Sequence, residues 1–305
     1  MNKTLMTFLR VMFSILLLVY VVYISGYNNI VESFSKINPW IYPLLFVLMI
    51  AYLFFGGINI ALLGKGVKEN ISLWKAIKYY AISFSLGMFV PGKLGDFSLI
   101  YFLKKDNIRT EKGFLISVLI KLFSVLVLGT VAIFGFRLFF SWKESLIYSG
   151  LTILLVLIVL IILLSANINH LLQKLVKKYA KNISYVRKMA KDFFRNNISR
   201  SGLIIMFTLA RFSVDAFITY LLLLFLNVHI GFFYILIINS IVAILAMIPI
   251  SISGLGIREG LKIYLLGILG VSAGVAGAVA LIYIVFIYLV AIFTIATYRV
   301  SDNYK

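Results

Sequence analysis

The sequence predicts an all-α integral membrane protein with about six full transmembrane helices and two oppositely oriented re-entrant hairpins. Hydrophobic residues make up 63% of the 305 residues and charged residues only 13%, whereas about a quarter of the residues in a soluble domain are charged. The apolar residues occur in runs of about 18 to 25, the length that crosses a bilayer. Two further apolar stretches are interrupted by Pro and Gly. We therefore treat residues 1–305 as a single polytopic membrane domain.

Six apolar runs are long enough to cross the membrane fully. The first could pass for a signal peptide because Lys3 and Arg10 flank it, but no small-residue cleavage site follows. We therefore interpret it as a retained helix. The predicted crossings are residues 5–24, 41–63, 114–136, 146–164, 203–226 and 276–298.

The distribution of basic residues predicts the orientation. Lys and Arg total 29 against 10 acidic residues, a net charge of +19, and they concentrate in the loops around 65–78, 104–112 and 174–200. Because such loops face the cytoplasm, the stretch 77–102 must enter and leave on the same side, and 232–269 must dip from the outer face. Both termini are then cytoplasmic, and we expect a multi-pass protein of the cell membrane.

The segment 166–200 is predicted to be a basic amphipathic cytoplasmic helix with a break. Apolar residues recur there at intervals of three and four, with Lys and Arg between them. Such a helix lies in the interface against anionic inner-leaflet head groups, although topology setting alone would also explain its charge. We expect membrane lipids as partners and no nucleic acid.

The two interruptions resemble each other and suggest an inverted repeat. One contains Pro91-Gly-Lys-Leu-Gly-Asp96 and the other Gly254-Leu-Gly-Ile-Arg-Glu259. Non-helical backbone at membrane depth is tolerated only where it is buried in protein or lines a cavity. Paired broken helices in two halves of a chain are typical of a transporter substrate site.

These interruptions also carry the chemistry of an anion site. A helix beginning after Gly95 or Gly256 would present free N–H groups to an anion, and the neighbouring bases would add charge-assisted hydrogen bonds. Alternatively, the acids only cap the helices and the bases neutralise them. The candidate substrate-binding residues are Lys93, Gly95, Asp96, Gly254, Gly256, Arg258 and Glu259.

Two more candidates, Arg211 and Asp215, lie near the middle of the fifth crossing, four residues apart on one helical face. They either pair with each other or face the substrate cavity, because an isolated charge there is costly. Lys121, in the third crossing, either snorkels to the inner head groups or reaches the interior. The 18 Tyr and three Trp fit interfacial belts at least as well as a stacking site.

At these residues the chain resembles the flippase-like transmembrane domain family that includes the membrane region of lysylphosphatidylglycerol synthases. The run from Pro249 to Gly260 is the more specific match. The family commonly has Gly-Glu followed three residues later by Arg, where this chain has Gly95-Asp96 and then Leu99. It also commonly has a Glu-Arg-x-x-Asp cluster in the next span, where this chain offers Ile120-Lys121 and Ser124. The resemblance implies movement of aminoacylated or polyprenyl-linked lipids between leaflets, and a lipid-modifying enzyme as a partner.

Three functional classes remain open. A lipid flippase-like protein is the leading hypothesis, with a membrane-embedded phosphatidylglycerol lysyltransferase-like enzyme and a secondary transporter of a small anion as alternatives. The chain has no Cys, its two His residues are His170 and His229, and it contains no nucleotide-binding motif. It also ends soon after the last crossing, so we expect no soluble synthase domain, no metal and no cofactor.

Overall fold

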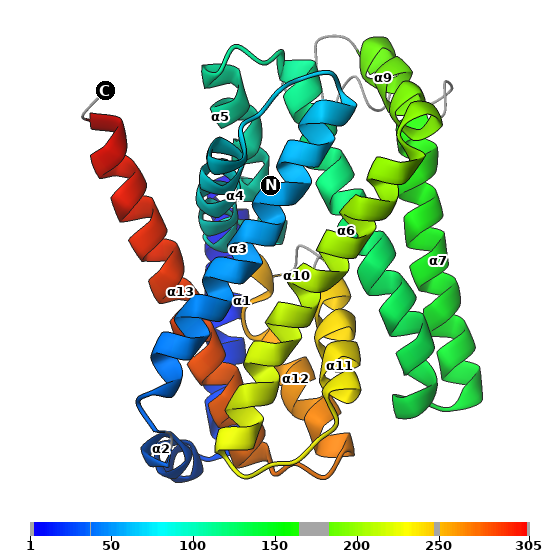
Figure 1. Ribbon diagram of the computed structural model, residues 1–305. Coiled ribbons are helices and arrows are strands. Elements are labelled where there is room, and N and C mark those ends of the chain that lie inside the picture. The colour runs from blue at the N-terminus through cyan, green and yellow to red at the C-terminus, as the bar shows by residue number, and fades with distance from the viewer. Residues whose placement is uncertain (1–2, 37, 165–182, 247–250, 304–305) are drawn as a thin grey trace.

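The computed structural model describes residues 3–36, 38–164, 183–246 and 251–303, with side chains except at 3–10, 91–94, 155–164, 183 and 299–303. The described residues form α-helices and two short 3-10 helices, η1 and η2, and no strand (Figure 1). The elements are α1 (Lys3–Ser25), α2 (Tyr27–Ser35), α3 (Ile41–Gly66), α4 (Leu73–Met88), η1 (Pro91–Ser98), α5 (Leu99–Lys105), α6 (Thr110–Phe139), α7 (Trp142–Leu164), α9 (Ile183–Asn196), α10 (Ile198–Phe225), α11 (Phe232–Leu245), η2 (Ile252–Gly254), α12 (Ile257–Ile268) and α13 (Ala273–Asn303).

Four of the described helices are long and apolar enough to cross a bilayer, namely α3, α6, α10 and α13. They fall on four of the six predicted crossings. The bent pair α1 and α2 makes a fifth if it counts as one crossing. The predicted crossing 146–164 falls on α7, whose side chains are described only to residue 154. The all-α class expected of an integral membrane protein is thus confirmed.

One element was not predicted from the sequence. The chain turns at Gly26, where φ is 75°, and α2 then runs at 78° to the preceding helix. This helix buries Ile30 against the bundle and exposes Tyr27 and Val31. Its amphipathic pattern is only nine residues long, which is too short to distinguish a helix from a loop by periodicity.

The first interrupted stretch forms a half-length hairpin. The helix α4 runs from the end of the bundle near α9 to its middle, and η1 with α5 returns to the α9 end (Figure 1). The side chains of α4 pack on α3 and α13. The α9 end of the bundle therefore carries both ends of this hairpin.

The second interrupted stretch forms a hairpin in the opposite direction. The helix α11 rises from the end near α2 to the middle, and α12 returns to the α2 end (Figure 1). The tips of the two hairpins touch, since η1 contacts η2. The Ser253 hydroxyl lies 3.8 Å from the Met88 sulfur, and the Tyr288 hydroxyl donates to the Met88 carbonyl at 3.0 Å. The two breaks in the sequence thus lie side by side at the centre of the molecule.

Helix α10 connects the two hairpins to the rest of the bundle. It packs against α3, where the buried Asn59 amide donates to the Thr208 hydroxyl at 2.9 Å, and against α11, α6 and α13. A polar pair between apolar helices fixes their rotation relative to each other because either group would lose its partner if the helix turned. This rotation directs Arg211 into the interior.

The described part of the basic amphipathic segment forms α9. Val186, Ala190 and Phe193 are buried against the bundle, whereas Lys188, Lys191 and Arg195 are exposed. The predicted break near residue 182 lies outside the described residues. The contact of this segment with a cytoplasmic lipid surface stays a prediction.

Candidate functional site

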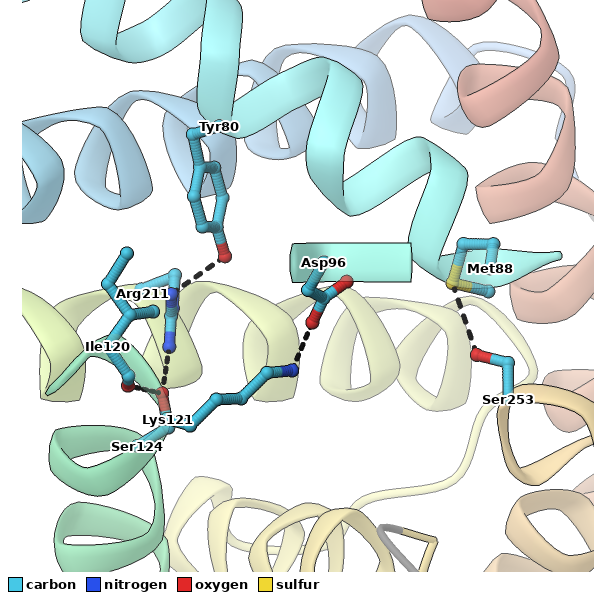
Figure 2. Close-up of polar contacts among 8 residues, drawn as sticks. All are labelled: Tyr80, Met88, Asp96, Ile120, Lys121, Ser124, Arg211 and Ser253. Carbon is cyan, nitrogen blue, oxygen red and sulfur yellow. Dashed lines mark hydrogen bonds and ion pairs between the residues drawn. The ribbon is translucent and has the colours of Figure 1, made fainter. Parts of the chain in front are cut away.

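Arg211 lies at the centre of the bundle and is only 3% exposed. Figure 2 shows its guanidinium between α4 and α6, where it donates to the Tyr80 hydroxyl at 2.7 Å and to the Ser124 hydroxyl at 2.8 Å. Ser124 is free to accept because its own proton goes to the Ile120 carbonyl at 2.7 Å. The rings of Tyr52 and Tyr80 lie 5.6 and 5.5 Å from the guanidinium carbon, a distance at which aromatic faces attract a cation.

Asp96 and Lys121 form an ion pair beside Arg211 (Figure 2). Lys121 therefore reaches the interior rather than only the head groups. One carboxylate oxygen of Asp96 meets the ammonium, and the other packs against Gly87, where an added Cβ would lie 1.8 Å from it. The sequence predicted an α-helix starting after Gly95, and this was wrong, because residues 91–98 form a 3-10 helix and the α-helix starts at Leu99.

A small cavity separates these groups. Its volume is about 70 Å³, which is room for several water molecules. The polar and charged residues that line it are Ser83, Asp96, Ser117, Lys121, Ser124 and Arg211, with the phenols Tyr52 and Tyr80. Three buried polar atoms on this lining have no hydrogen-bond partner among the described residues, namely Arg211 Nε, Ser83 Oγ and Asp96 Oδ1.

A second polar cluster lies one helical turn further along α10. Asp215 accepts hydrogen bonds from the Tyr283 hydroxyl and from the Asn239 amide, the latter at 3.2 Å. The Lys262 ammonium, whose residue is 5% exposed, donates to Thr219 at 3.2 Å and lies 4.4 Å from the centre of the Tyr283 ring. Arg211 and Asp215 thus face different partners and do not pair with each other.

Arg258 and Glu259 begin α12 at the edge of this second cluster. The Arg258 guanidinium carbon lies 5.8 Å from the Tyr283 ring, and no carboxylate lies within ion-pair distance in the described part of the chain. Glu259 accepts the Gly256 N–H at 2.6 Å, so it caps the helix as the simpler alternative proposed. Gly254 and Gly256 have φ of 80° and 82°, a region that favours glycine.

The structure brings most of the predicted residues to one region of the interior. Arg211 and Asp96 line the cavity, and Asp215, Arg258 and Glu259 belong to the second cluster. The side chain of Lys93 lies outside the described residues. Whether any of them binds substrate stays a prediction.

The sequence interpretation missed several residues of the site. Lys262 follows Arg258 by four positions and therefore shares its helical face, a signal that could have been used. Three interior tyrosines carried no such signal, because 18 Tyr residues also fit interfacial belts. The missed residues are Tyr52, Tyr80, Thr219, Asn239, Lys262 and Tyr283.

Buried charges where two opposed broken hairpins meet define a class of protein, the polytopic helical membrane proteins with a central polar site. The family model for the lysylphosphatidylglycerol synthase TM region matches residues 7–294. The chain belongs to this family, as its motifs indicated, and it is a multi-pass membrane protein related to lipid metabolism or transport. No curated protein matches the chain.

Proposed function

We propose that this protein moves a phosphate-bearing lipid between the two leaflets of the cell membrane. The observation that carries the proposal is the polar site at which the two half-length hairpins meet, where Arg211 and Lys262 are buried and Lys121 and Arg258 are partly buried. Charged side chains in the middle of a membrane protein are costly and mark substrate pathways. The membership in a lipid-related family agrees with a lipid as the substrate.

The proposal places six helices across the bilayer and treats the two hairpins as re-entrant. All three Trp residues are exposed at helix ends, with Trp40 and Trp142 near the α2 end and Trp74 near the α9 end. Trp is enriched at both membrane interfaces. The basic α9 end faces the cytoplasm in this arrangement, together with both termini.

In the proposed mechanism, the lipid phosphate binds the buried guanidinium and ammonium groups while the tails remain in the bilayer. Asp96 holds the Lys121 ammonium in place, and Lys93 of the first hairpin is a further candidate for the phosphate. A cavity of about 70 Å³ is far smaller than the roughly 300–1,000 Å³ of a typical ligand pocket. The hairpin tips must therefore separate for a head group to enter, which breaks the contact of Met88 with Ser253.

Reconstitution tests this function. Purified protein is placed in vesicles whose lipids carry a fluorophore on an acyl chain, and a membrane-impermeant quencher reports the fraction that has changed leaflet. We expect faster exchange with the native protein than in protein-free vesicles. An Arg258→Ala, Glu259→Ala double variant whose midpoint of thermal unfolding equals that of the native protein should exchange lipid more slowly than the native protein does. Equal rates for native protein and this folded variant would count against the proposal.

A second candidate is a secondary transporter of a small anion. The size of the cavity favours it, because a small inorganic anion needs little more space than the structure already offers. Uptake of radiolabelled phosphate into the same vesicles, with no lipid exchange, would support this candidate instead.

A further inference from the structure

Lys262 is a buried ammonium that touches only neutral groups among the described residues. The residue is 5% exposed, and its Nζ donates to the Thr219 hydroxyl at 3.2 Å and lies 4.4 Å from the centre of the Tyr283 ring. No carboxylate lies within ion-pair distance of it in the described part of the chain. A buried charge with no opposite charge beside it is strongly unfavourable. The charged form of Lys262 therefore depends on what else occupies the interior.

Lys262 differs in this respect from the other three cations where the hairpins meet. Arg211 and Arg258 keep their protons because a guanidinium is not deprotonated in proteins. Lys121 is held in its charged form by the ion pair with Asp96. Lysines in protein interiors, by contrast, are documented to exchange a proton near neutral pH. Lys262 is therefore the cation of this region that is placed to change its charge.

The charge of the surrounding cluster depends on the Lys262 proton. The titratable and charged groups that face Lys262 come from α10, α13 and its own helix, and they are Asp215, Tyr283, Arg258 and Glu259. The helix α11 adds the neutral amide of Asn239, and the described side chains of α1 carry no charge. With both carboxylates ionised, the cluster is neutral when Lys262 is protonated and carries one net negative charge when it is not. A phosphate nearby is repelled in the second state and not in the first.

Asp215 is the other group of the cluster able to carry a proton. Its two carboxylate oxygens already accept hydrogen bonds, one from the Tyr283 hydroxyl and the other from the Asn239 amide at 3.2 Å. A proton on either oxygen would face a donor that is already there. The neutral amine of Lys262 has a lone pair with no such competitor, so the geometry favours Lys262 over Asp215.

Building on the proposed function, we infer that Lys262 takes up a proton when an anionic lipid head group binds where the hairpins meet and releases it on the other side, so that proton and lipid move together. The proton comes from water on the side to which the site is open and forms an N–H bond with the amine lone pair. It returns to water when the head group leaves. The pair crosses without net charge, because the proton balances the single charge of a phosphodiester.

Phosphatidylglycerol exchange in vesicles at equal inner and outer pH tests the proton site. From about pH 6 to about pH 9, the rate with the native protein should fall at least fivefold, because Lys262 loses its proton as the pH rises. Lys262→Arg keeps the charge and should vary less than twofold, whereas Lys262→Met should be slow at every pH. Lys104→Met, at an exposed position on α5, is the matched control and should follow the native protein.

The same series separates Lys262 from Asp215. Asp215→Asn leaves the proton site intact, so its rate should still fall as the pH rises. A pH dependence like that of the native protein in either folded Lys262 variant would contradict the inference. Its loss in Asp215→Asn together with its persistence in Lys262→Met would assign the proton to Asp215 and overturn it as well.

A pH gradient tests the coupling itself. Valinomycin with equal K⁺ on both sides holds the membrane potential at zero, and the vesicle interior is made one pH unit more alkaline than the outer buffer. Coupling of one proton to one lipid should then enrich labelled phosphatidylglycerol in the inner leaflet by up to about tenfold over protein-free vesicles, and Lys262→Arg should exchange lipid without this enrichment. Exchange by the native protein with no enrichment would overturn the coupling and leave the proposed function in place. No exchange at any pH would overturn both.

Discussion

Arg211 is held in the interior by hydroxyl oxygens and aromatic rings, with no carboxylate in ion-pair distance among the described residues. Neutral acceptors stabilise a guanidinium less completely than a carboxylate does. The charge therefore remains available to an incoming anion. A carboxylate at Tyr80 or Ser124 would neutralise it and close the site to anions.

Tyr80→Phe tests the hydrogen bond to Arg211. The change removes only the phenolic oxygen that accepts at 2.7 Å. A hydrogen bond to a charged group contributes about 1.5–3 kcal/mol, so the variant should unfold at a lower temperature in detergent. Tyr264→Phe, at a residue that is 59% exposed on α12, is the matched control and should unfold as the native protein does. Equal midpoints for the two variants would mean that Arg211 does not depend on this oxygen.

Gly87→Ala tests the position of Asp96. The new methyl group would lie 1.8 Å from the Asp96 carboxylate, which must move and give up its contact with Lys121. Overpacking of this kind costs about 1–3 kcal/mol. Gly202→Ala, in α10 with nothing within 4 Å, should leave the midpoint of thermal unfolding unchanged or slightly raised. A Gly87→Ala protein as stable as Gly202→Ala would show that the carboxylate is not fixed there.

At the scale of elements, the turn before α12 sets where Arg258, Glu259 and Lys262 lie. Gly256 has φ of 82°, and an added Cβ would meet Leu17 of α1 at 2.3 Å. The helix α1 thus packs directly against the second hairpin. The Ser14 hydroxyl of α1 also accepts a hydrogen bond from the Ile252 N–H at 3.0 Å.

Gly256→Ala should therefore destabilise the second hairpin. A non-glycine residue in this conformation costs about 1–3 kcal/mol, to which the clash with Leu17 adds. The midpoint of thermal unfolding should fall, while Gly267→Ala in the same helix, where nothing lies within 4 Å, should not lower it. A stable Gly256→Ala variant would contradict the close packing of α1 on this turn.

The elements were more predictable than the contacts between them. Runs of apolar residues specified α3, α6, α10 and α13 because a crossing needs about 20 of them in succession. The Pro and Gly interruptions likewise indicated both hairpins. The sequence could not indicate that Lys121 meets Asp96 or that Tyr80 meets Arg211, because these pairs join helices 25 and 131 residues apart. The start of the second arm was predicted directly after Gly95, but the 3-10 helix continues to Ser98 and α5 begins at Leu99.

At the scale of the whole molecule, the direction of each hairpin relative to the membrane can be measured directly. The chain has no Cys, so single substitutions introduce the only thiol. Ser72 and Arg109 flank the first hairpin, and His229 and Ser272 flank the second, all at exposed positions. In intact cells an impermeant maleimide should label His229→Cys and Ser272→Cys, and should label Ser72→Cys and Arg109→Cys only after permeabilisation. Labelling of Ser72 and Arg109 from opposite sides would contradict a re-entrant first hairpin.

We propose that a buried cation at the meeting point of the hairpins moves an anionic lipid across the membrane. The most direct test compares phosphatidylglycerol exchange in vesicles by native protein, Arg211→Gln and Arg200→Gln, two changes of the same kind on α10, one buried and one exposed. We expect Arg211→Gln to lose at least nine-tenths of the protein-dependent rate and Arg200→Gln to retain it, with both proteins eluting as the native protein does. Equal exchange by the two folded variants would contradict a role of the buried cation in transport.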